Sequence, residues 1–406
     1  MPAPFSVASF ADSIADFTTS YIRPPLGTPA DAVAAAIRLT PRLFAQAPLT
    51  DEPGGFPTQE MQWLREAGLL TAVLPTQLGG AGLGEPAATW PLLQVLYHVG
   101  RGNLAVGRIY EGHVNALLLI RCFGTPAQLT RYAADAYAGH LFGMWNTENP
   151  TEGVHLMPHG AGYRLRGAKT FASGAGHLTR PLLTGALPAR QGWQMLVLDA
   201  TAQLPVLDRS FWRPLGMRAT ASFRADVTGL QVGATDLLGE PNDYYRAPWF
   251  GGGASRFAAV QLGGAAAVLD ETRRFLRRLG RTDDPYQRQR LGELLALHET
   301  GLRWLRGAAT AAALPATTTE VLSPAHLAAL GAYVALLRST VEDSCLRTLQ
   351  LAERSVGARG LLQPEPFERL HRDLTHYLRQ PAPDAVLADA GRFALASDQP
   401  AYELFM

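Results

Sequence analysis

Two short, glycine-bounded segments carry the side chains best suited to chemistry. The first contains Trp145, Asn146 and Thr147, and the second, further along the chain, contains Phe171 and Ser173. Polar and apolar residues alternate in both segments, which is typical of extended strands. Hydroxyls and an aromatic ring on such strands suit a flat aromatic cofactor with a polar edge. The pattern predicts that both segments contact one bound cofactor.

Composition excludes several functional classes. The 406 residues are 47% hydrophobic and 17% charged, with a formal net charge of +1, so nothing favours a nucleic-acid or membrane-surface partner. No uncharged apolar run reaches the ~18 residues that a membrane span needs. Two distant cysteines, Cys122 and Cys345, fit a reducing compartment, and the first 21 residues lack the basic start of a signal peptide. We therefore expect a cytoplasmic protein.

A metal centre is not expected. His155 and His159 are four residues apart, but Pro158 and Gly160 argue against the helix that would bring them together, and no third ligand is apparent.

Periodicity indicates a multi-domain α+β fold with three regions. Residues 1–140 are expected to form a helical domain. Short β-rich runs separated by glycine, proline and aspartate in residues 141–240 predict an antiparallel sheet or barrel that carries the cofactor contacts. Residues 241–406 contain long apolar stripes at three- and four-residue spacing, which predict a four-helix bundle that also forms the oligomer contacts.

Five arginines gather on one side of the first long helix of the third region. We expect a solvated or subunit-facing surface there, with a phosphate site as the alternative. They are Arg273, Arg274, Arg277, Arg278 and Arg281.

From Phe56 to Leu378 the chain resembles the acyl-CoA dehydrogenase superfamily of FAD enzymes. Each motif alone is weak, but their order and spacing together are specific. Besides the two segments above, the motifs are Trp63–Leu69, Gly79–Leu83, Phe123–Gln128, Trp212–Thr220 and Arg354–Gly360.

The resemblance implies a non-covalently bound FAD and a homodimer or homotetramer. Thr147 and Ser173 would offer hydroxyls to the flavin O4/N5 region, and Phe171 would pack against the ring. The turn that ends at Gly360 would approach the flavin of a neighbouring subunit, and Lys169 would form a structural ion pair. The implied cofactor-binding residues are Trp145, Asn146, Thr147, Phe171, Ser173, Gly357 and Gly360.

The expected catalytic base is missing. In most members a glutamate follows an Arg-Asp pair by eight residues, but here the pair is Arg372-Asp373 and that position is Pro381. A minority of members place the base near the position of Ser255-Arg256, again without a carboxylate. Dehydrogenation needs a base that removes the α-proton of the acyl thioester while hydride moves to flavin N5.

Three functions remain open. The leading one is α,β-dehydrogenation of an acyl thioester on CoA or a carrier protein, with electron-transfer flavoprotein or O2 as electron acceptor. Its relocated base would be one of the nearby candidates Glu365, Glu368, His371, Asp373 and His376. The alternative is a monooxygenase on the same fold that uses reduced flavin and O2, and the third is a non-catalytic flavin- or acyl-binding protein. His376, the candidate catalytic residue, resembles the histidine that such monooxygenases place near the flavin.

Overall fold

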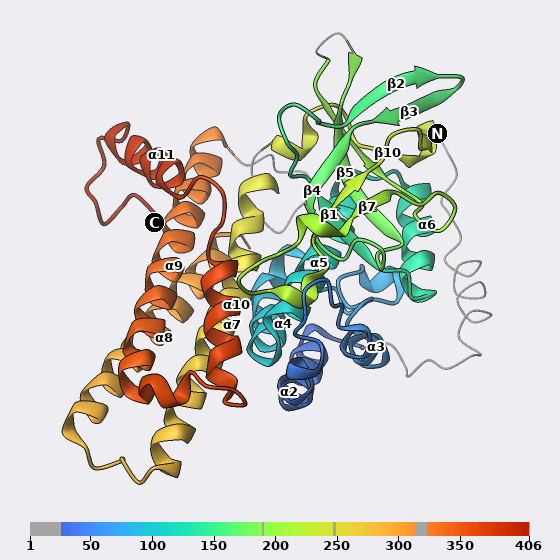
Figure 1. Cartoon of the computed structure of the whole chain (residues 1–406). Helices are drawn as coiled ribbons and strands as arrows, with labels where there is room; N and C mark the ends of the chain where they lie inside the picture. Colours follow the sequence, from blue (N-terminus) through green and yellow to red (C-terminus); the bar gives the residue numbers. More distant parts are fainter. Residues whose placement is uncertain (1–25, 189–190, 247–248, 313–322, 406) are drawn as a thin grey trace.

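The computed structural model describes residues 26–188, 191–246, 249–312 and 323–405. The first 21 residues, for which we predicted no signal peptide, lie outside these ranges. A helical region, a sheet region and a second helical region follow one another along the chain (Figure 1), which confirms the predicted fold class. The division at residues 140 and 240 stays a prediction.

The N-terminal helices are capped by side chains typical of helix starts. The Thr28 hydroxyl accepts from Asp31 N–H, and Thr125 and Gln128 form a reciprocal capping box. Asn103 caps a helix that is buried on almost every face. The helices are α2 (Pro29–Gln46), α3 (Thr58–Glu66), α4 (Thr89–Gly102), α5 (Leu104–Phe123) and α6 (Pro126–Tyr137).

The middle region forms two sheets. The larger has the order β10-β6-β5-β2-β3-β9 with β1 paired to β5, and the smaller has the order β4-β8-β7. Because β1 and β2 both pair parallel to β5, the larger sheet is mixed, and the expectation of a purely antiparallel sheet was wrong. The strands are β1 (Phe142–Trp145), β2 (His155–His159), β3 (Gly162–Arg166), β4 (Ala168–Ala172), β5 (Arg180–Ala186), β6 (Trp193–Val197), β7 (Val206–Asp208), β8 (Phe223–Asp226), β9 (Gln231–Val232) and β10 (Leu237–Leu238).

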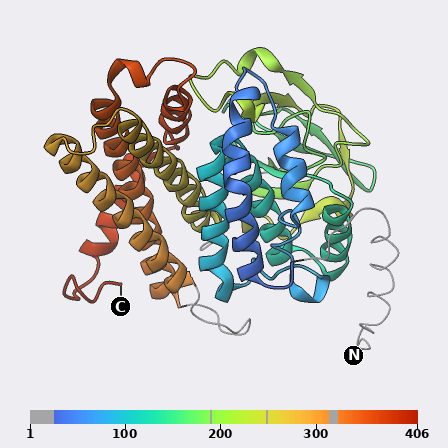
Figure 2. The same cartoon turned by 90° about the horizontal axis from the view of Figure 1, so that it is seen from below.

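The C-terminal helices pack lengthwise against one another, as the two views in Figures 1 and 2 show. Helix α7 contacts α8, α9 and α10 within this region and also packs against α4 and α5, so it joins the two helical regions. No described helix is long and apolar enough to span a membrane. The helices are α7 (Trp249–Arg278), α8 (Pro285–Ala312), α9 (Pro324–Gly360), α10 (Pro366–Tyr377) and α11 (Pro383–Leu395).

Candidate functional site

An aromatic cluster joins the smaller sheet to the end of α10. The ring of Phe171 meets Phe211 and Trp212 edge-on, with centroids 5.2 and 6.2 Å apart. Trp212 in turn lies perpendicular to the imidazole of His376, 5.4 Å away. Phe171 and His376, two predicted site residues 205 positions apart in the sequence, therefore belong to one cluster.

A local irregularity in β4 exposes Phe171. The register of β4 against β8 shifts between Lys169 and Ala172, and Phe171 adopts a φ of 50°. A bulge of this kind redirects a side chain out of the regular alternation. The ring is 50% exposed. The left-handed backbone at Phe171 holds the apolar ring outward. An exposed aromatic ring of this kind can stack against a planar ligand.

Helix α10 is fixed against the loop that carries Trp212. Asp373 accepts a 2.6 Å hydrogen bond from Met217 N–H, and Arg372 pairs with Asp51 at 2.6 Å. A Cβ on Gly216 would lie 2.1 Å from the carbonyl oxygen of Arg372, so only glycine allows this approach. These contacts place His376, one turn beyond Asp373, against Trp212.

His376 is suited to proton transfer. Partial burial lowers the pKa of its imidazole, so the neutral form, which can donate or accept, predominates at neutral pH. Within the described ranges its ring nitrogens have no hydrogen-bond partner. Each of the remaining base candidates is engaged in an ion pair. Those pairs are His371–Glu353, Glu365–Arg278, Glu368–Arg372 and Asp373–Arg369.

The position of the usual glutamate is occupied by a residue that cannot act as a base. Pro381 follows α10, is exposed, and accepts a 2.6 Å hydrogen bond from Arg338 through its carbonyl oxygen. It presents no group that could take a proton.

The two glycine-bounded segments lie side by side. Thr170 N–H donates to the carbonyl oxygen of Thr147 at 2.9 Å, and the indole N–H of Trp145 donates to the carbonyl oxygen of Ser173 at 3.0 Å. Thr147 is exposed, whereas Trp145 is buried in the core. Of this group, Thr147 and Phe171 have the side chains most accessible to a ligand.

Asn146 and Ser173 are partly buried and hydrogen-bonded. Asn146 Oδ1 accepts from the hydroxyl of Thr184 at 2.6 Å and from that of Tyr245 at 3.4 Å. Ser173 Oγ accepts from Ser222 at 2.9 Å. Both side chains therefore have fixed orientations beside the exposed Thr147 and Phe171 pair.

The Gly357–Gly360 turn is not part of this cluster. It closes α9, with Gly357 at a φ of 62°, and lies at the opposite end of α10 from His376. Since the 12 residues of α10 span ~18 Å, one flavin ring cannot contact both ends within the same subunit. Contact with the flavin of another subunit stays a prediction.

Arginines line a cavity of about 180 Å³ at this far end of the bundle. Arg281 and Arg288 are paired with neighbouring aspartates, while Arg277 forms no ion pair within the described part of the chain. The carboxamide oxygen of Gln287 is buried there without a described hydrogen-bond partner. The cavity thus presents excess positive charge and an unsatisfied polar group.

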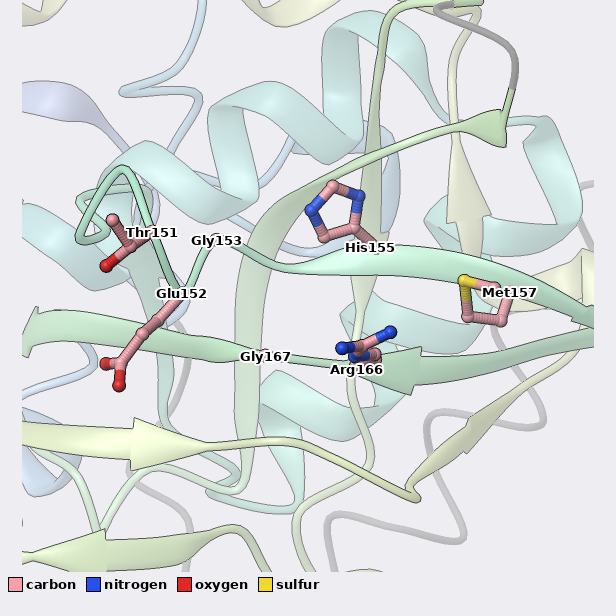
Figure 3. A pocket seen from close by; sticks show the side chains of 7 residues that line it. All are labelled: Thr151, Glu152, Gly153, His155, Met157, Arg166 and Gly167. Atoms are coloured by element: carbon pink, nitrogen blue, oxygen red, sulfur yellow. The ribbon is translucent and has the colours of Figure 1, made fainter.

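A second cavity, of about 280 Å³, is lined by β2, the end of β3 and the loop at residues 151–153 (Figure 3). His155 and Arg166 rise from neighbouring strands, and Glu152 points away from both in that view. Glu152 instead pairs with Arg224. No group of three potential metal ligands occurs among the residues described.

Sequence reasoning missed a group of charged and polar residues between α5, α7 and α10. We call it the inner polar cluster, and it consists of Arg108, Glu111, Asn115, Arg256 and Tyr377. A signal was present, because Arg108 and Glu111 lie three residues apart in an otherwise mainly apolar helix.

Comparison with known proteins agrees with the fold. The family described as "Acyl-CoA dehydrogenase, N-terminal domain" matches residues 34–140. A dibenzothiophene monooxygenase of Rhodococcus erythropolis is 27% identical over 94% of this chain and 97% of its own length. The probable FMNH2-dependent monooxygenase SfnC of Pseudomonas putida is also 27% identical, over 93% and 98%.

Solved structures share the fold over most of the chain. FMN-bound TdsC from Paenibacillus sp. A11-2 has a TM-score of 0.80 at 20% identity, covering 92% of this chain and 100% of that one. Methanesulfinate monooxygenase MsuC from Pseudomonas fluorescens has a TM-score of 0.78 at 21% identity, covering 92% and 99%. Butyryl-CoA dehydrogenase from Megasphaera elsdenii has a TM-score of 0.78 at 17% identity, covering 91% and 98%.

Proposed function

We propose that this chain, which belongs to the acyl-CoA dehydrogenase superfamily, is a monooxygenase that uses reduced flavin and O2. The observation that carries the proposal is the contact between Trp212 and His376. Of the five base candidates, His376 alone joins the aromatic cluster, and the four others lie in ion pairs. The full-length similarity to a dibenzothiophene monooxygenase and to SfnC supports this reaction over dehydrogenation.

Bound reduced flavin would supply two electrons to O2, so that one oxygen atom enters the substrate and the other leaves as water. The residues of the chain would hold and enclose that reaction. Phe171 would pack against the isoalloxazine ring, and Thr147 and Ser173 would lie at its polar edge. Neutral His376 would exchange a proton with the reacting oxygen, a role that needs no carboxylate base.

We propose FMN as the flavin in place of FAD. SfnC is named for FMNH2, and TdsC has been solved with FMN. The arginine cavity would take the phosphate of the flavin held by a neighbouring subunit, because phosphate favours clustered guanidinium groups. The Gly357–Gly360 turn would approach the same flavin, so the arrangement requires at least a homodimer.

The test is oxygen transfer from ¹⁸O2. The protein, supplied with chemically reduced FMN, is mixed with dibenzothiophene, methanesulfinate and indole, and products are analysed by mass spectrometry. One ¹⁸O atom in a product supports the proposal. Anaerobic bleaching of bound FAD by acyl-CoAs, without ¹⁸O incorporation, would instead show a dehydrogenase, and failure to bind either flavin would show a non-catalytic protein.

The matched variant is His376→Phe, which keeps an aromatic ring against Trp212. We expect product formation to fall by a factor of about 10² to 10⁴, the usual contribution of a general acid or base. FMN affinity should change little. Full activity in this variant would remove His376 from the reaction.

A further inference from the structure

The inner polar cluster is linked by a continuous set of hydrogen bonds. Arg108 donates to Glu111 at 2.6 Å, and the Asn115 amide donates to the other oxygen of Glu111. The Asn115 carbonyl oxygen accepts from Nε of Arg256. One carboxylate and one amide therefore hold two guanidinium groups from α5 and α7.

The charges of this cluster do not balance. Arg256 forms no ion pair within the described part of the chain, and the nearby Glu111 is already paired with Arg108. Burial lowers the pKa of Arg256, and the charge of Glu111 only partly offsets this effect. Burial of a guanidinium without a carboxylate of its own is unfavourable unless another group compensates its charge.

The neighbouring phenols and thiol do not supply negative charge. Burial raises the pKa of Tyr244 and of Tyr377 above the ordinary value, and it raises that of Cys122 to about 11. All three groups are neutral at neutral pH, so the cluster keeps one net positive charge.

Tyr377 adds an unused donor. Its side chain is 4% exposed, and its hydroxyl has no hydrogen-bond partner within the described ranges. The charges of Glu111 and Arg108 both act on the pKa of this hydroxyl. A buried hydroxyl in this state is a donor without an acceptor in the protein.

The cluster and His376 share the C-terminal end of α10. Tyr377 follows His376 directly on α10. A Cβ on Gly112 would lie 3.9 Å from Nη1 of Arg108 and 3.7 Å from the backbone nitrogen of Met144 on β1. The Arg108 side chain keeps 28% of its surface exposed, so it can be reached by a small molecule.

We propose that the substrate carries a compact oxyanion, such as a carboxylate, sulfinate or sulfonate, bound by Arg256, Arg108 and Tyr377. This assignment of the occupant as substrate rests on the proposed monooxygenase function. Guanidinium groups bind such planar or tetrahedral oxyanions through paired N–H donors, and the Tyr377 hydroxyl would add a third contact. The rest of the substrate would then extend toward His376.

The test compares each anion with its neutral counterpart. Benzoate and benzamide, and methanesulfonate and methanesulfonamide, are titrated by calorimetry into full-length protein containing oxidised FMN. We expect each anion to bind at least about ten-fold more tightly than its neutral partner, as hydrogen bonds to charged groups do. Equal affinities, or tighter binding of the amides, would overturn the proposal.

Two variants locate the binding. Arg256→Gln should weaken benzoate binding by about ten-fold or more without affecting benzamide, and exposed Arg303→Gln on α8 is the matched control. Tyr377→Phe removes only the unpaired hydroxyl, so the protein should fold normally while benzoate affinity falls about 3- to 10-fold. Unchanged benzoate binding in a folded Tyr377→Phe protein would contradict the assigned contact even if Arg256→Gln fails to fold.

The two proposals fail separately. The calorimetric titration uses neither O2 nor reduced flavin, so absence of ¹⁸O transfer would leave the anion site standing. Conversely, ¹⁸O transfer to neutral substrates with no preference for anions would overturn the anion site and leave the monooxygenase function.

Discussion

The indole of Trp212 and the imidazole of His376 lie at 89° to each other, with their centroids 5.4 Å apart. One ring belongs to a loop of the sheet region and the other to α10. The candidate catalytic residue and the candidate flavin platform are therefore held in place by the packing between two regions of the chain. Changes at this junction should affect both.

The junction itself can be tested at Gly216. In Gly216→Ala, the new methyl group would meet the backbone of Arg372, so we expect the free energy of unfolding to fall by about 2–4 kcal/mol. Urea denaturation measures this change. Gly331→Ala is the control, because nothing lies within 4 Å of its Cβ position in the interior of α9, and it should stabilise the protein slightly. Equal effects of the two substitutions would show that α10 and the loop are not tightly docked.

The role of Phe171 can be separated from stability. Phe171→Gly removes a half-exposed ring and also relieves a φ of 50°, so the two effects on stability should largely cancel. FMN affinity should nevertheless fall by up to about ten-fold through loss of the aromatic contact. Flavin fluorescence titration and thermal denaturation measure the two quantities. A protein with lower stability and unchanged FMN affinity would assign Phe171 to packing alone.

The arginine cavity makes a prediction about phosphate. Arg277→Glu should weaken FMN binding by about ten-fold or more, because it reverses a charge proposed to face the phosphate. Riboflavin, which lacks the phosphate, should bind to the variant and to the unmodified protein alike. Exposed Arg303→Glu controls for the change in net charge. If FMN and riboflavin are weakened equally, the cavity does not bind phosphate.

Stability should depend on pH through His113. Its Nδ1 accepts from Phe142 N–H and its Nε2 faces the carbonyl oxygen of Leu70, so the ring is neutral with the proton on Nε2. Burial lowers its pKa to about 4. Above pH ~6.5, the ordinary pKa of histidine, His113 is unprotonated in both the folded and the unfolded chain. Its full contribution to the free energy of unfolding is then present.

As pH falls from about 6.5 to about 4, the unfolded chain takes up a proton that folded His113 does not, so stability is lost. The loss should reach about 3 kcal/mol at most. Urea denaturation across this range measures it. The glutamine side chain in His113→Gln does not titrate, so the stability of this variant should depend less steeply on pH. The difference in slope should correspond to at most one bound proton. Identical slopes would contradict the assignment.

Local sequence patterns were sufficient to predict the order of the helical, sheet and second helical regions. Helical stripes and short β-rich runs depend on neighbouring residues, and the sequence shows them directly. The outward position of Phe171 could not be predicted, because a register shift depends on how β4 pairs with β8. The resemblance pointed to His376, but its contact with Trp212 depends on packing between segments distant in sequence, such as the hydrogen bond between Met217 and Asp373.

The inner polar cluster was missed for a related reason. Arg108 and Glu111 could have been noticed as charges in an apolar helix. Arg256 and Tyr377 join them only because α7 and α10 pack beside α5. Charge balance in a buried site depends on all of its members, and these lie on three helices.

Lys169 is the only lysine, and its ammonium group is fully buried in a 2.5 Å ion pair with Glu148. Burial lowers its pKa, an effect that Glu148 opposes. Reagents that acylate side-chain amines therefore cannot reach Lys169 while the sheet region stays folded around it. The rate at which this one amine is labelled, followed by mass spectrometry, is a built-in measure of how often that region opens.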